Sequence, residues 1–170
     1  MKLNPILIII AAILTLFLQT TILNFFDVFS LKPDFLFIWI IISSFYLPLR
    51  SAVFTNWSIG IIVDITSNSG FGTFGFIYIA IGLFIFLLRE IFYSEDIITR
   101  MNIALGSLLI CHFMYSLSLV IFKSAFSVWF AAFKSIGITF YTGVFIFLIF
   151  LTMDKIKGLI LAKQLREELK

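Results

Sequence analysis

Six runs of apolar residues account for most of the chain, and charged residues, prolines or turn residues separate each run from the next. A run of about twenty apolar residues is long enough to cross the hydrocarbon core of a bilayer as a helix. The third run covers only about 22 Å at 1.5 Å per residue, so either residues 66–69 continue it or its neighbours cover a short helix. The pattern predicts six membrane-spanning helices, at about 5–25, 35–47, 51–65, 73–88, 103–122 and 133–153.

The first run follows a short polar start and superficially resembles a secretory signal. It continues for about twenty residues, whereas the apolar core of a signal peptide has 7–15, and no Ala-x-Ala-like cleavage site follows it. We therefore interpret this run as a retained first helix.

The third run carries a stripe of small and polar residues at every fourth position: Ala52, Asn56, Gly60 and Asp64. Residues four apart share one face of a helix, and small or polar residues on a membrane helix mark the face that meets other helices. A charged carboxylate at the centre of a bilayer costs roughly 2.5–3.5 kcal/mol, so keeping Asp64 requires a compensating contact. We expect Asp64 to accept backbone N–H groups or to pair with a hydroxyl, and contact with a partner or ligand is the alternative.

A glycine-rich turn joins the third run to the fourth and contains Ser67, Ser69 and Gly72. Gly75 and Gly82 then lie on one face of the fourth helix, so the two helices can approach closely. We expect the hydroxyl groups of the turn, with that of Thr73, to cap the start of the fourth helix. The sequence therefore predicts a tight, capped junction between the third and fourth helices.

The composition fits this pattern, with 62% hydrophobic and 12% charged residues, against about 25% charged in soluble domains. We predict an all-α integral membrane protein with a transmembrane domain at 1–153 and a short basic amphipathic tail at 154–170. The tail is expected to continue the sixth helix or to lie at the membrane interface. The chain has one cysteine, which excludes an intrachain disulfide and a cysteine-rich metal site.

The distribution of Lys and Arg predicts the orientation. If the N-terminus is cytoplasmic, nine basic residues lie inside, and three lie outside: Lys32, Lys123 and Lys134. The positive-inside rule then favours six spans with both termini in the cytoplasm. Topology also accounts for the net charge of +3 without a nucleic-acid partner.

A search for catalytic motifs finds none. The chain lacks a phosphate-binding loop and a Gly-x-Ser-x-Gly elbow, and its single histidine, His112, is far in sequence from any aspartate. We interpret His112 as an interhelical hydrogen-bonding residue, with a proton relay or ligand as the alternative. We therefore expect no enzyme activity, no metal site and no cofactor.

Three segments together resemble the MreD family, the small integral membrane subunit of the bacterial rod-shape machinery. They are Leu18-Gln19, Pro33-Asp34-Phe35, and the longer segment Gly60-x-x-x-Asp64-Ile-x-Ser67-x-Ser69-x-Phe-Gly72. The resemblance covers nearly the whole chain, and the third segment is its most specific part. The residues that we expect to form a structural and partner-binding motif are Gln19, Pro33, Asp34, Gly60, Asp64, Ser67, Ser69, Gly72 and Gly75.

The resemblance implies a non-enzymatic scaffold or regulatory subunit of the elongasome, the cell-wall synthesis complex that maintains rod shape, in the bacterial inner (plasma) membrane. It implies MreC as the direct partner, and MreB, RodA and a class B penicillin-binding protein as indirect ones, in contact with membrane lipid. It also implies a fold similar to the substrate-binding S-components of ECF vitamin transporters.

That implied fold supplies the alternative function, a vitamin-binding S-component. A third possibility is a proton-coupled carrier that uses Asp64 and His112. An S-component needs several convergent polar groups around its ligand, and the sequence offers few on the outer side. We therefore expect the scaffold role.

Overall fold

The computed structural model describes residues 4–21, 32–66, 72–92, 96–123 and 128–168. Every element within these ranges is an α-helix, as the apolar pattern predicts. The helices are α1 (Pro5–Thr21), α2 (Phe35–Tyr46), α3 (Leu49–Thr66), α4 (Thr73–Ile91), α5 (Ile97–Lys123) and α6 (Val128–Glu168).

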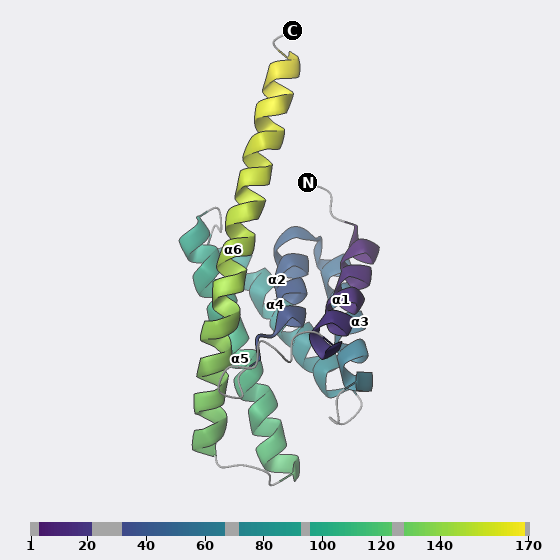
Figure 1. Ribbon diagram of the computed structural model, residues 1–170, viewed down its shortest axis with the longest axis vertical. Coiled ribbons are helices and arrows are strands. Elements are labelled where there is room, and N and C mark those ends of the chain that lie inside the picture. The colour runs from purple at the N-terminus through teal and green to yellow at the C-terminus, as the bar shows by residue number, and fades with distance from the viewer. Residues whose placement is uncertain (1–3, 22–31, 67–71, 93–95, 124–127, 169–170) are drawn as a thin grey trace.

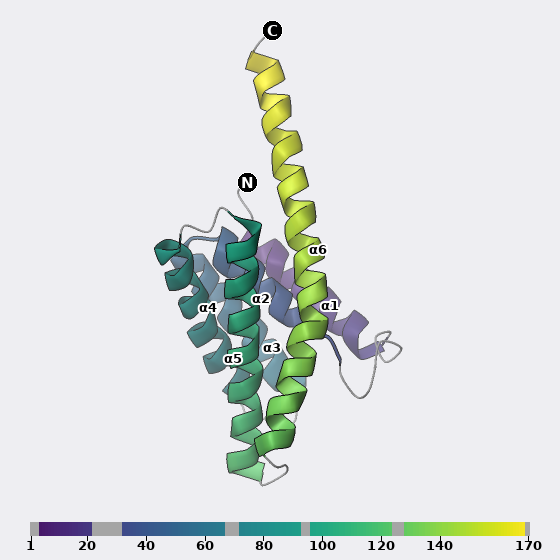
Figure 2. The same cartoon turned by 90° about the vertical axis from the view of Figure 1, so that its left-hand side faces the viewer.

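The helices form two groups that meet at α2 and α4 (Figure 1). The helices α5 and α6 pack along one another, and α3 packs chiefly on α4. The helix α6 continues well beyond the bundle, and its C-terminal extension points toward the same end as the N-terminus (Figures 1 and 2). Successive helices therefore run in alternating directions through one bundle.

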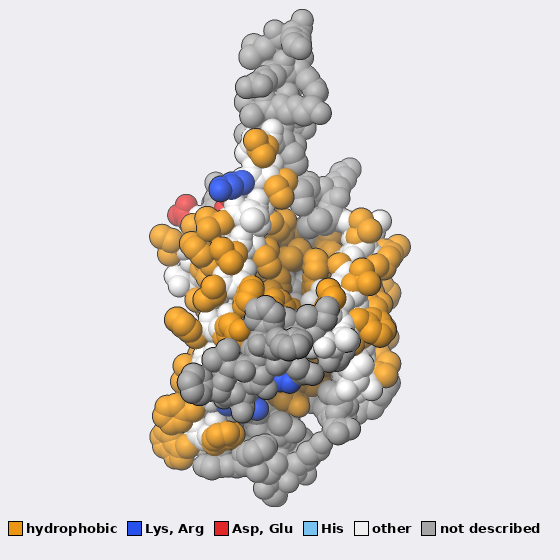
Figure 3. Space-filling view, in the orientation of Figure 1, with side chains coloured by type: hydrophobic (Ala, Val, Ile, Leu, Met, Phe, Trp, Pro, Cys, Tyr) orange, Lys and Arg blue, Asp and Glu red, His pale blue; other side chains and the backbone are white. Residues whose placement is uncertain are grey.

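Within the described ranges, three helical segments are long and apolar enough to cross a membrane: Thr73–Ile91, Ile97–Leu117 and Ala132–Ile156. Two further helices, α1 and α2, are apolar but shorter. Large apolar side chains are also spread over the coloured part of the surface in Figure 3, as expected for a protein in contact with lipid. The structure thus supports a membrane location, whereas six complete spans remain a prediction.

The helix boundaries differ from the prediction at both ends of the segment between α4 and α5. Arg89 and Glu90 lie within α4, and Arg100 lies in the first turns of α5, although all three fall between the predicted helices at 73–88 and 103–122. Contacts of the two arginines explain the difference. Arg89 donates to carbonyl groups at the end of α2. Arg100 is only 5% exposed, and its guanidinium donates to an Asp154 carboxylate oxygen at 3.0 Å and to the Tyr46 hydroxyl at 3.2 Å.

The helix α6 is continuous through the predicted boundary between residues 153 and 154. Of the two structures expected for the tail, the protein has a continuation of the sixth helix. The division into two domains stays a prediction. The predicted end of the first span, at residues 22–25, lies outside the described residues.

The small-residue stripe on α3 faces other helices, as predicted. Ala52, Asn56 and Asp64 are 4% exposed or less. The Asn56 side chain donates to the Ser44 hydroxyl on α2 at 3.1 Å and also accepts from the Ser43 hydroxyl. This polar contact joins α2 to α3 in the interior of the bundle.

Candidate functional site

Asp64 joins the end of α3 to the start of α4. Its two carboxylate oxygens accept hydrogen bonds from the backbone N–H groups of Phe74, at 2.9 Å, and Gly75, at 3.1 Å. These groups belong to the first turn of α4, where no helical carbonyl is available to them. The expectation that Asp64 accepts backbone N–H groups is confirmed, and the positive end of the α4 dipole favours its charge.

The start of the fourth helix is capped by this carboxylate. The N-cap residue is Gly72, which has no side chain and adopts a left-handed conformation with φ of 91°. Glycine reaches this conformation without the strain that a β-carbon introduces. The cap is therefore supplied by the preceding helix. Ser67 and Ser69 lie outside the described residues.

The backbones of α3 and α4 approach most closely at Gly60. A β-carbon on Gly60 would lie 2.6 Å from the Cα atom of Gly75 and 2.8 Å from the Phe74 carbonyl oxygen. No side chain fits there unless the two helices move apart. Gly60, Asp64, Gly72 and Gly75 thus form one unit, which we call the α3–α4 junction.

A second group of predicted residues gathers at the start of α2. One carboxylate oxygen of Asp34 accepts the Phe37 backbone N–H at 3.0 Å and caps α2, while its backbone N–H donates to the Thr142 hydroxyl of α6 at 2.9 Å. The Gln19 side-chain amide of α1 donates to the Pro33 carbonyl oxygen at 3.3 Å. Gln19, Pro33 and Asp34 therefore tie α1, α2 and α6 together.

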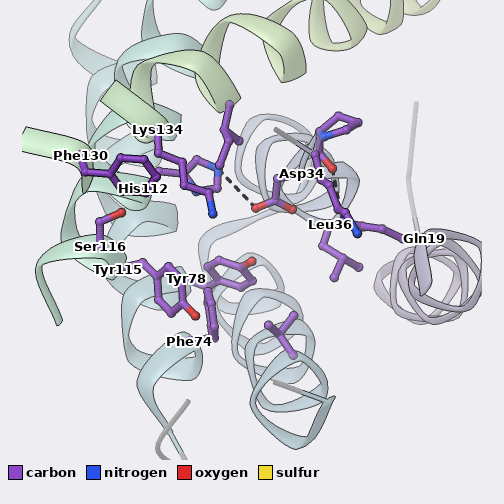
Figure 4. A pocket seen from close by; sticks show the side chains of 14 residues that line it. Gln19, Asp34, Leu36, Phe74, Tyr78, His112, Tyr115, Ser116, Phe130 and Lys134 are labelled. Carbon is purple, nitrogen blue, oxygen red and sulfur yellow. Dashed lines mark hydrogen bonds and ion pairs between the residues drawn. The ribbon is translucent and has the colours of Figure 1, made fainter. Parts of the chain in front are cut away.

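The other oxygen of the Asp34 carboxylate faces His112 on α5. The His112 Nε2 atom lies 3.6 Å from it, close enough for an ion pair when the imidazole is protonated (Figure 4). The histidine does contact another helix, as expected, although through a carboxylate at ion-pair distance and not through a hydrogen bond. Nε2 is buried and has no hydrogen-bond partner among the described residues.

Asp34 and His112 lie in the wall of a cavity of about 390 Å³ to which all six helices contribute. Figure 4 shows the labelled side chains around this space. The cavity is lined by Gln19, Lys32, Pro33, Asp34, Leu36, Val63, Phe74, Tyr78, His112, Tyr115, Ser116, Phe130, Lys134 and Ile138.

The structure therefore separates the predicted motif into two groups. Gln19, Pro33 and Asp34 line the cavity, and the glycines with Asp64 form the α3–α4 junction. Phe74 connects the two, because its backbone N–H binds Asp64 while its side chain lines the cavity.

Sequence reasoning did not find the cavity or the pairing of Asp34 with His112. A usable signal was present in Lys32 and Lys134, two of the three basic residues that the predicted topology places on the outer side. Among the described residues, no three His, Cys, Asp or Glu side chains are close enough together to hold a metal ion.

A family model described as rod shape-determining protein MreD matches residues 1–156 of the chain. No curated protein and no solved structure matches the chain. The match extends from α1 through the part of α6 that packs in the bundle, and it includes both groups of motif residues.

Proposed function

Because this chain belongs to the MreD family of rod shape-determining proteins, we propose that it acts in that machinery as a non-enzymatic membrane scaffold that binds MreC. The observation that carries the proposal is the family match over residues 1–156. MreB, RodA and a class B penicillin-binding protein are then linked to this chain indirectly, through the same assembly.

The use of polar groups in the bundle supports a structural role. Asp64 caps α4, and Asn56 joins α2 to α3. Catalysis requires groups that are positioned toward a substrate and not committed to holding the fold. The two polar residues of the α3 stripe hold helices together, which is what a scaffold needs.

We further propose six membrane spans with both termini in the cytoplasm of a bacterial cell. The alternating direction of the helices and the shared end of the N-terminus and the α6 extension support this arrangement (Figure 2). On this topology Arg100 and Asp154 lie at the cytoplasmic side, and the cavity lies toward the outer side. The similarity to ECF S-components remains an expectation from the family.

Affinity purification of the full chain from its native membrane tests the scaffold proposal. We expect MreC and wall-synthesis enzymes to co-purify. Asp64→Ala should lower the yield of that complex and produce rounded cells, whereas Glu90→Ala, at an exposed position on α4, should do neither.

Two results would contradict the proposal. Recovery of ATPase coupling subunits in place of MreC would favour the vitamin-transporter alternative. Normal recovery of MreC and normal cell shape with Asp64→Ala would remove the α3–α4 junction from the proposed role.

A further inference from the structure

Two of the residues that line the cavity between the six helices are His112 and Gln19. The buried Nε2 atom of His112 and the buried Oε1 atom of Gln19 have no hydrogen-bond partner among the described residues. Both residues line the cavity, so polar side chains form part of its wall.

The remaining lining groups show what kind of molecule fits. Lys32 and Lys134 are exposed at the cavity, and the Asp34 carboxylate and the hydroxyls of Tyr78 and Tyr115 lie around it. Ammonium groups bind phosphate oxygens, whereas a carboxylate accepts hydrogen bonds from hydroxyl groups. The lining therefore combines an anion-binding part with a hydroxyl-binding part.

The location of Lys32 and Lys134 relative to the membrane also needs an explanation. On the proposed orientation they are two of the three basic residues on the outer side, where the positive-inside rule disfavours them. Their position at one cavity supplies a reason for retaining them. This step depends on the proposed topology, which labelling experiments test separately.

The spacing of charges along α6 places the cavity at a membrane boundary. Lys134 and Asp154 are twenty residues apart on this helix, which corresponds to roughly 30 Å at 1.5 Å per residue and matches the thickness of the hydrocarbon core. With Asp154 at one boundary, Lys134 lies at the other. The headgroup region, with its phosphate groups, begins just outside this boundary.

We propose that this cavity binds a phosphate ester that also carries hydroxyl groups. The phosphate lies between Lys32 and Lys134, and the hydroxyl groups donate to Asp34. The ester comes either from the headgroup of a phospholipid in the outer half of the bilayer or from a soluble molecule. Phosphatidylglycerol and glycerol 3-phosphate are suitable probes, because both combine a phosphate with free hydroxyl groups.

The test uses the purified full chain in nanodiscs of phosphatidylcholine that contain phosphatidylglycerol as a minor lipid. Native mass spectrometry then counts the lipids that remain bound after release into detergent. We expect selective retention of phosphatidylglycerol over phosphatidylcholine and over phosphatidic acid, which has the phosphate but no hydroxyl groups. Lys32→Gln and Lys134→Gln should each lower retention about tenfold, the effect of losing one charge-assisted hydrogen bond.

Lys155→Gln is the matched control, because Lys155 is also an exposed lysine on α6 but does not line the cavity. In the unmodified chain, phosphatidylglycerol should protect Lys134, and not Lys155, from acylation by an amine-reactive reagent. This second measurement holds even if a variant fails to fold.

The outcomes distinguish the two sources of the ester. Displacement of bound phosphatidylglycerol by glycerol 3-phosphate, with protection of Lys134 by the soluble compound alone, supports a soluble ligand. Retention that glycerol 3-phosphate does not reverse supports a lipid headgroup. Equal retention of phosphatidylcholine and phosphatidylglycerol, or equal loss in all three lysine variants, would overturn the proposal. None of these results depends on whether MreC co-purifies.

Discussion

Asp64 shows how a charged side chain is accommodated in an apolar bundle. Asp64 is only 4% exposed, and its two carboxylate oxygens accept hydrogen bonds from backbone N–H groups in the first turn of α4. The helix end gains a cap, and the carboxylate gains two donors and the favourable end of a helix dipole. The carboxylate and the first turn of α4 stabilise one another, which makes the pair a fold-defining contact.

We predict that Asp64→Ala lowers the free energy of unfolding by about 2–4 kcal/mol, because two buried N–H groups lose a charged acceptor. Asp64→Asn should have an intermediate effect, since the amide retains one acceptor oxygen and presents a donor to the other N–H. Unfolding of the purified chain in detergent measures both changes. A loss no larger than that of the exposed control Glu90→Ala would contradict the capping role.

Gly60 allows a distinct prediction about close packing. Gly60→Ala should destabilise the chain by more than about 2 kcal/mol, because the new β-carbon would meet the backbone of α4 and not a flexible side chain. Gly75→Ala should have a smaller effect, because the nearest atom to its β-carbon is a side-chain oxygen at 3.6 Å. Thermal unfolding of the two variants measures the difference.

Gly106→Ala is the control for this comparison. Gly106 lies on α5, and no atom lies within 4 Å of the position that a β-carbon would take there. Alanine also favours a helix more than glycine does. We therefore expect Gly106→Ala to be neutral or slightly stabilising. Equal changes in stability for Gly60→Ala and Gly106→Ala would contradict the close-approach role of Gly60.

At the scale of single helices, α2 is short and depends on contacts at both ends. It has 12 residues, a length at which an isolated helix is marginal. Asp34 caps its N-terminus. At its C-terminus, Arg89 of α4 donates to the carbonyl oxygens of Ser44, at 3.0 Å, and Phe45, at 2.6 Å. Asp34 and Arg89 therefore provide hydrogen-bonding partners for backbone groups at the two ends of α2.

We predict that Arg89→Met lowers the free energy of unfolding by about 1–2 kcal/mol, because it removes a cation from the C-terminal carbonyls of α2. Arg50→Met is the control, since Arg50 is exposed at the start of α3. Denaturation in detergent measures both variants. The capping role would be refuted if the two substitutions had the same effect.

For the whole molecule, two groups of charged side chains lie toward opposite ends of α5 and α6. Arg100 and Asp154 are paired where α5 begins and α6 leaves the bundle. The cavity with Asp34, His112 and Lys134 lies toward the other end of α5 and α6. The intervening part of α6 is apolar, so the molecule has the charge distribution of a protein embedded in a bilayer.

Cysteine labelling tests the proposed orientation of this bundle. On a Cys111→Ala background, Trp129→Cys should react with a membrane-impermeant maleimide in intact cells. Lys155→Cys should react only after the cells are permeabilised. Both native residues lie on α6, and both are exposed. The reverse pattern would invert the topology, and labelling of both sites from outside would exclude a membrane crossing by α6.

The helical architecture, the membrane class and the polar face of α3 could all be predicted from the order of residues. These features are local, because the apolar runs and the four-residue spacing from Ala52 to Asp64 lie within single helices. The family resemblance, carried by short segments, was also accessible from the sequence and is confirmed by the family match.

The structure was needed to show which helix faces pack against one another. Packing paired Asp34 with His112, and Arg100 with Asp154, across helices that are far apart in the chain. It also brought Asp64 of α3 to the backbone N–H groups at the start of α4. The physical reason is that helical periodicity fixes the direction of a side chain relative to its own helix. The partner of that side chain depends on how all six helices pack.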